Sequence, residues 1–148
     1  MCSHAQFITM NLTVERVYCH EPLRRTDARF LIAETVAFCE AANPLFLSRP
    51  DWMVTATCVS AYGFCGFYVL IAVVVLTRTW ASFRTPLTLF MGAKLNAILF
   101  YHVMEFTSTM PPPNIAAYFA VESPYLLSIG LVLYKILAAE VAQKQKGS

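Results

Sequence analysis

Charged residues are scarce in this sequence. Asp, Glu, Lys and Arg make up only 14% of its 148 residues, whereas soluble domains usually carry roughly 25%. Hydrophobic residues account for 57% of the chain, so the composition indicates a membrane protein of one domain. The net charge of +2 is too small to indicate a nucleic-acid binder.

Several familiar motifs are also missing. The chain contains no P-loop, no GxGxxG sequence and no internal repeat. It has five cysteines, an odd number, and we expect no disulfide framework. Cys58 and Cys65 lie in an apolar run and are predicted to be packed thiols. The cysteines and histidines near the N-terminus match no paired zinc spacing, so we expect no metal site.

The segment 53–77 has neither charge nor proline and is the first predicted membrane span. As a helix it would be roughly 37 Å long, which exceeds a hydrocarbon core of about 30 Å. Trp52 and Trp80 flank it, as interfacial anchors do. Small residues let helix backbones approach closely, so we expect the face with Gly63 and Gly66 to pack against another helix.

Two further spans are predicted. The second runs from about Pro86 to Phe106, because proline is favoured in the first turn of a helix. The third runs from Pro124 to about Ala142. Between them, residues 108–123 read as a loop broken by prolines.

An amphipathic helix is predicted over residues 27–42, with Thr26 or Asp27 as its cap and Asn43-Pro44 at its end. It is too short and too charged to span a membrane. We expect it to lie at the membrane interface, and the alternative is a soluble docking helix. The predicted fold is all-α, an integral membrane bundle of three transmembrane helices preceded by an amphipathic interfacial helix.

This reading divides the chain into a polar N-terminal segment (1–51), a three-span membrane domain (52–142) and a basic tail (143–148). Basic residues in short flanks favour the inner side of a membrane. We therefore place the loop 78–84 and the C-terminus on the inner side, and the N-terminus opposite.

The second span holds polar residues that lipid disfavours, in the stretch KLNAILFYHVME at 94–105. In one interpretation, Lys94 snorkels to the inner headgroups while Glu105 and Glu122 lie at the outer interface. In a second, the outer half of the bundle contains a polar pocket for a lipid or a partner. In a third, the polar residues contact another subunit. The candidate residues are Lys94, Asn96, Tyr101, His102, Glu105 and Glu122.

No catalytic residue is predicted among them. Lys94 and Glu105 share one helical stripe, because eleven residues is close to three turns. They are nevertheless roughly 16 Å apart along the axis, too far for a catalytic pair.

Four short motifs occur in order: NPLF at 43–46, RPDW at 49–52, FRTP at 83–86 and PYLL at 124–127. Together they resemble the EXPERA membrane family, which includes emopamil-binding protein, a sterol isomerase, and the sigma-2 receptor. The resemblance covers about residues 43–140. It implies a helical membrane scaffold around a sterol or lipid ligand.

The chain departs from that family in two respects. The family has four spans, and the first is replaced here by the polar N-terminal segment. Acids that help hold cationic ligands in the receptor branch are absent here, at Asn43 and near Ser60. His102 and Glu105 look similar to the isomerase's histidine and glutamate but lie on a different helix, so no catalytic role carries over.

The favoured function is a non-catalytic accessory subunit of a larger membrane complex, with membrane lipids and other membrane subunits as partners and no nucleic acid. The alternative is a sterol- or lipid-binding protein. A sterol isomerase ranks third, because only His102, Glu105 and Glu122 could supply an acid and a base. We expect no cofactor, and a bound lipid or sterol is the ligand to seek.

The predicted location is the mitochondrial inner membrane or the endoplasmic reticulum. No acidic residue precedes Glu15, and several arginines follow it, which favours organelle targeting.

Overall fold

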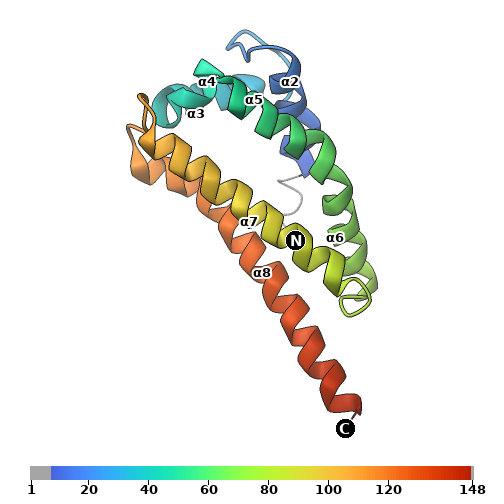
Figure 1. Cartoon of the computed structure of the whole chain (residues 1–148). Coiled ribbons are helices and arrows are strands. Elements are labelled where there is room, and N and C mark those ends of the chain that lie inside the picture. Colours follow the sequence, from blue (N-terminus) through green and yellow to red (C-terminus); the bar gives the residue numbers. More distant parts are fainter. Residues whose placement is uncertain (1–7, 148) are drawn as a thin grey trace.

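The computed structural model describes residues 8–147. Their regular secondary structure is helical, with loops between the helices and no strand. Three helices are long and apolar enough to cross a membrane: Asp51–Thr77, Arg84–Thr107 and Ile115–Ala142. Shorter helices precede them (Figure 1). The prediction of an all-α membrane protein with three spans is confirmed.

The first span consists of α5 (Asp51–Cys58), the π-helical segment η2 (Val59–Phe64) and α6 (Cys65–Thr77), which run as one helix. It follows Pro50 and has Asp51 in its first turn, where a carboxylate opposes the positive end of the helix dipole. It ends at Arg78, which is left-handed with φ 58°. The predicted start at residue 53 is two residues late.

The second span is α7 (Arg84–Thr107), close to its predicted bounds. The third begins much earlier than predicted, because α8 (Ile115–Gly147) contains Pro124 in its interior. The side chain of Asn114 accepts a hydrogen bond from the Ala117 amide at 3.0 Å and so caps the start of α8. Transmembrane helices tolerate internal proline. The predicted loop 108–123 therefore ends at Asn114, and Glu122 lies inside the third span.

The spans meet at one end of the molecule and diverge at the other (Figure 1). At the closed end, beside the loop 78–83, Arg84 forms an ion pair of 3.1 Å with Glu140 of α8. This pair joins the start of the second span to the end of the third, in agreement with the predicted topology. An apolar core fills the space between α6, α7 and α8, formed mainly by Tyr68, Ile71, Val74, Leu87, Phe90, Met91, Ile98, Ile129, Val132 and Ile136.

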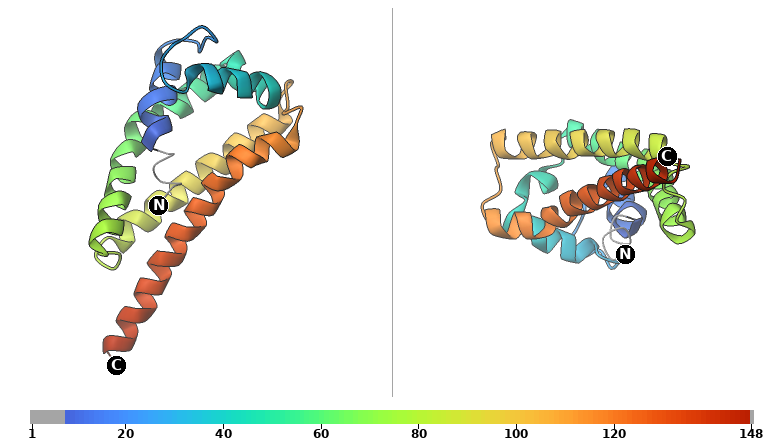
Figure 2. Two further views of the ribbon diagram at one scale, coloured as in Figure 1. Left: turned by 180° about the vertical axis from the view of Figure 1, so that it is seen from behind. Right: turned by 90° about the horizontal axis from the view of Figure 1, so that it is seen from below.

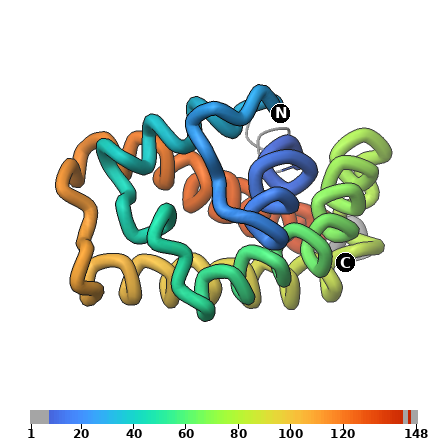
Figure 3. Tube along the Cα trace, turned by 90° about the horizontal axis from the view of Figure 1, so that it is seen from above, coloured from blue at the N-terminus to red at the C-terminus, as the bar shows by residue number. Residues whose placement is uncertain are grey.

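The N-terminal region occupies the space between the diverging ends (Figures 2 and 3). Residues 8–20 form a continuous helix that includes η1 (Asn11–Glu15) and α2 (Arg16–His20). We call this helix the strap. The sequence did not predict it. Two more helices follow, α3 (Ile32–Ala42) and α4 (Pro44–Ser48).

The predicted amphipathic helix exists as α3, but it begins at Ile32 rather than at residue 27. Asp27 does not cap it, because its carboxylate accepts hydrogen bonds from the Arg29 amide and guanidinium within the preceding loop. Leu31 then adopts a left-handed φ of 65°. The predicted end at Asn43-Pro44 is confirmed. The buried face of α3 consists of Ile32, Val36, Cys39 and Ala42.

The prediction for the glycines of the first span is wrong. Gly63 and Gly66 lie on an exposed face, and a Cβ at Gly66 would meet nothing within 4 Å among the described residues. Ala61 is the small residue that is fully buried. The prediction rested on small residue size, which does not determine which face of the span meets another helix of this chain.

Candidate functional site

A cavity of about 180 Å³ lies between the strap, the first span, α7 and α8, and it is partly open to the outside. Its walls combine apolar and aromatic side chains with a small group of polar ones. The polar and aromatic residues that line it include Glu15, Phe46, Ser60, Phe64, Lys94, Tyr101, Glu122 and Tyr125. Such a mixture is typical of ligand sites in proteins.

Helix α7 supplies one wall, because Lys94, Ile98 and Tyr101 follow the spacing of a single helical face. Lys94 is only 9% exposed. Its Nζ atom lies 5.4 Å from the ring centre of Phe64 and 5.5 Å from that of Tyr68, which are cation–π distances. Snorkelling to the headgroups, as predicted for Lys94, is therefore wrong: the ammonium group lies inside the protein.

Two carboxyl groups lie near this ammonium group. Glu15 of the strap and Glu122 of α8 are both near enough for their charges to attract Lys94. Glu15 also accepts a hydrogen bond from the Asn11 amide at 2.5 Å. Burial raises the pKa of Glu15 above its ordinary value, while the charge of Lys94 and hydrogen bonds from Ser60 and Asn11 oppose that rise. Three chain segments thus contribute one ionisable group each.

Two π-helical segments face each other across this part of the molecule. Segment η1 contacts η2, and the buried Asn11 amide lies 3.4 Å from the Ser60 hydroxyl. Glu15 from η1, with Ser60 and Phe64 from η2, lines the cavity. Wide turns of this kind occur often at functional sites. Here they place polar side chains of two helices on the same cavity wall.

A second polar group lies beside the cavity, further from the closed end. The Asn43 amide donates a hydrogen bond of 2.6 Å to the Tyr101 hydroxyl. Glu105 is fully buried next to this pair. Neither of its carboxylate oxygens has a hydrogen bond of standard geometry within the described chain, although the Tyr101 and Asn43 side chains lie beside it. Glu105 thus lies inside the protein near the end of α7, and its predicted position at the outer membrane interface stays a prediction.

The six candidate residues do not form one site. Lys94, Tyr101 and Glu122 line the cavity, and Glu105 is adjacent to Tyr101. His102 points elsewhere on α7, with its Nδ1 atom 2.8 Å from the hydroxyl of Tyr118 on α8. Asn96 is exposed and is not part of the cavity wall.

Glu15 and Ser60 are the site residues that the sequence analysis missed. A signal was present, because Asn11, Val14, Glu15 and Tyr18 recur at helical spacing in a segment read only as polar.

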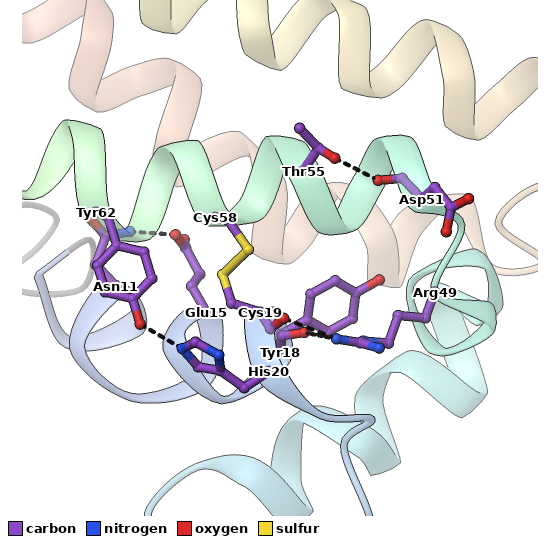
Figure 4. The surroundings of a disulfide bond; sticks show 10 residues. All are labelled: Asn11, Glu15, Tyr18, Cys19, His20, Arg49, Asp51, Thr55, Cys58 and Tyr62. Atoms are coloured by element: carbon purple, nitrogen blue, oxygen red, sulfur yellow. Dashed lines mark hydrogen bonds between the residues drawn. A yellow bond between two sulfur atoms is a disulfide. The ribbon is translucent and has the colours of Figure 1, made fainter.

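A disulfide holds the strap to the first span. Cys19 is bonded to Cys58, with 5.3 Å between their Cα atoms (Figure 4). The expectations that no disulfide forms and that Cys58 is a packed thiol are wrong, while Cys65 is a partly buried free thiol. The Tyr18 hydroxyl adds a hydrogen bond of 2.8 Å to the Phe46 carbonyl. The strap is thus attached at its C-terminal end, and its preceding turns form a wall of the cavity.

The apolar core beyond Lys94 closes the bundle toward the loop 78–83, so the polar groups are confined to the end where the spans diverge. Within residues 8–147, no cluster of three or more His, Cys, Asp or Glu side chains is arranged to hold a metal ion.

Comparison of the chain with protein-family models, curated proteins and solved structures found no match. The resemblance to the EXPERA family therefore stays a prediction.

Proposed function

We propose that this chain is a non-catalytic membrane protein that binds an amphiphilic molecule of sterol or lipid type in the cavity. The observation that carries the proposal is the composition of the cavity wall. Lys94, Glu15 and Glu122 form a polar group within a wall that is otherwise largely apolar and aromatic. A ligand with one polar end and an apolar body matches both parts of that wall.

The size of the cavity supports partial enclosure of such a ligand. A volume of about 180 Å³ accommodates a polar head and the adjoining atoms of an amphiphile. The remaining apolar body extends through the open side toward lipid, where its exposure costs no hydrophobic free energy. The ligand is therefore anchored by its polar end.

A binding role fits the charges better than sterol isomerisation does. Glu15 and Glu122 both favour the ammonium form of Lys94, so two carboxyl groups and one ammonium group form a single electrostatic cluster. Isomerisation requires one group that gives a proton to the substrate and another that removes one. His102 lies outside the cavity wall and does not supply the second group.

Fluorescence can test this proposal directly. The chain has two tryptophans, so Trp80→Phe leaves Trp52 as the only donor for energy transfer to dehydroergosterol. Trp52 packs against the cavity residue Tyr101, with 6.5 Å between ring centres. In lipid nanodiscs we expect saturable transfer, and at least tenfold weaker affinity after Lys94→Met. Asn96→Leu, on the exposed face of the same helix, should bind as the parent does.

Non-saturable transfer, or equal affinities for the Lys94 and Asn96 variants, would contradict the proposal. Extraction of the purified protein followed by mass spectrometry should also recover a stoichiometric sterol or lipid from the parent and less of it from Lys94→Met.

A second candidate, an accessory subunit of a larger membrane complex, is favoured by the shape of α8. Its C-terminal half extends past the other helices (Figure 1). Tyr134, Leu137 and Val141 on this half are 64%, 60% and 56% exposed. An EXPERA-like scaffold in the mitochondrial inner membrane or the endoplasmic reticulum is part of this proposal. Native sizing after extraction in mild detergent tests it, since a monomer free of other subunits would contradict it.

A further inference from the structure

We infer that the Cys19–Cys58 disulfide is a redox clamp on the cavity: it holds the strap in place, and its reduction lets the strap move and opens the ligand site. This inference rests on the proposed function for its biological meaning, but the movement itself can be measured without any ligand.

The strap is a wall of the cavity and not merely a neighbour of it. Met10, Val14 and Glu15 all line the cavity, and Glu15 supplies one of the two carboxyl groups near Lys94. Displacement of the strap would therefore widen the opening and remove a carboxylate from the polar group. Both effects change the retention of an amphiphile.

Besides the disulfide, apolar packing such as that of Tyr18 with Met53 and several polar contacts hold the strap to the first span. The polar contacts include a hydrogen bond between Glu15 and Ser60, the 3.4 Å approach of Asn11 to Ser60 and the Arg16 guanidinium at 5.4 Å from the Tyr62 ring centre. His20 adds a 2.8 Å contact with the Tyr62 hydroxyl. This last contact is exposed to solvent, where a hydrogen bond contributes little. The disulfide is the one covalent link, and it joins residues 39 apart in the sequence.

The chain after the strap can accommodate a movement. Residues 21–31 are mostly exposed and form no helix. Arg29 pairs locally with Glu21 and Asp27, whereas Arg25 forms an exposed ion pair of 3.1 Å with Glu40 of α3, not with a span. No backbone hydrogen bond ties this loop to a span among those of the described residues. Exposed backbone with few tertiary contacts opens at low free-energy cost. The loop can therefore serve as the hinge.

Reduction of this disulfide needs one external dithiol. Cys19 and Cys58 are both partly exposed. A dithiol attacks one sulfur, and after thiol–disulfide exchange two electrons and two protons have passed to the cysteines. The products are the Cys19 and Cys58 thiols and the oxidised dithiol. Cross-links constrain the open ensemble most when they close long loops, so the loss of this one increases the population of the open strap.

Hydrogen exchange detected by mass spectrometry tests the clamp in lipid nanodiscs. On addition of dithiothreitol, we expect amides of residues 11–20 to exchange at least tenfold faster, while those of 87–105 stay unchanged. Cys39→Ser should respond as the parent does. Cys19→Ser combined with Cys58→Ser should exchange fast in the strap from the start and show no response to dithiothreitol.

Unchanged protection of residues 11–20 after complete reduction, verified by thiol counting, would overturn the inference. So would thiol counting that finds no disulfide in the protein as purified. If the double variant does not fold, hydrogen exchange of the parent measured over a titration with dithiothreitol still tests the inference.

A second readout separates this inference from the proposed function. Reduction should raise the dissociation rate of dehydroergosterol at least fivefold. If the strap loses protection but no sterol binds in either state, the clamp stands and the proposed ligand is wrong. If sterol binds and dissociates at the same rate in both redox states, the clamp does not govern the site.

Discussion

The guanidinium of Arg49 donates hydrogen bonds of 3.0 and 2.6 Å to the backbone carbonyl of Tyr18, which lies 31 residues earlier in the chain. A further bond of 3.1 Å reaches the carbonyl of Cys19. The last carbonyls of a helix have no partner within it, so Arg49 caps the strap from a distant segment. Its positive charge also opposes the negative end of the strap's dipole.

Removal of this cap should destabilise the N-terminal region. Arg49→Met leaves carbonyls without their charged donor, a loss of about 1–3 kcal/mol. Arg49→Lys should retain part of the stability, because an ammonium group cannot form the same fork of hydrogen bonds. Thermal unfolding in detergent measures both variants. Arg24→Met, at an exposed position in the next loop, is the control. Equal unfolding temperatures for the Arg49 and Arg24 variants would refute the cap.

Lys94 should contribute to stability as well as to binding. Lys94→Met leaves Glu15 and Glu122 without the buried charge that attracts them, and we expect a loss of about 3–5 kcal/mol. The triple variant that adds Glu15→Gln and Glu122→Gln should recover much of this loss. Chemical unfolding in mixed micelles checks the order of stabilities. A triple variant less stable than Lys94→Met alone would contradict this electrostatic account.

The raised pKa of Glu15 predicts a specific pH dependence. The folded protein binds the Glu15 proton more tightly than the unfolded chain, whose pKa is about 4.5. The contribution of this residue is therefore most favourable below pH 4.5 and diminishes as pH rises through the raised pKa. The parent should lose stability relative to Glu15→Gln over that range. A difference in unfolding temperature that does not vary with pH would show that Glu15 is not responsible.

Cys39 should resist alkylation while the protein is folded. Burial, with smaller effects from the charges of Glu105 and Glu122, raises the pKa of this thiol from 9.0 to about 12. At pH 8 almost all of this thiol therefore remains protonated and unreactive. Iodoacetamide followed by peptide mass spectrometry should modify Cys39 only after unfolding in dodecyl sulfate. Rapid modification in the native protein would mean that α3 opens readily.

Substitutions at Gly66 and Ala61 should behave in opposite ways. A side chain at Gly66 meets open space, so Gly66→Leu should change the free energy of unfolding by less than about 0.5 kcal/mol. Ala61 is 0% exposed, and Ala61→Leu should cost about 1–3 kcal/mol through overpacking. The same detergent unfolding assay compares them. A large loss at Gly66 would indicate that a partner outside this chain packs on that face.

The three spans were predictable because the free energy of inserting a helix into lipid depends on its own composition. The apolar segment 53–77 therefore identifies a span without any distant residue. The strap was not predictable from its own sequence, because its position depends on distant residues. Arg49 caps it, and Cys58 is bonded to it through the disulfide. The start of α8 was missed because Pro124 suggests a helix start, whereas the Asn114 cap comes earlier.

In the candidate site too, residues with a local sequence signal were predictable and residues placed by distant contacts were not. Tyr101 and Lys94 were predictable as polar residues within an apolar helix. Their partner Glu15 lies on a segment whose contact with the spans no local pattern encodes.

The divergence of the spans gives the molecule a wedge-like outline, narrow at the loop 78–83 and broad where the strap, α3 and α4 are inserted (Figure 1). A wedge occupies more area in one leaflet of a bilayer than in the other. Its insertion free energy therefore depends on membrane curvature, and a leaflet that bulges outward around the broad end accommodates it with the least lateral compression.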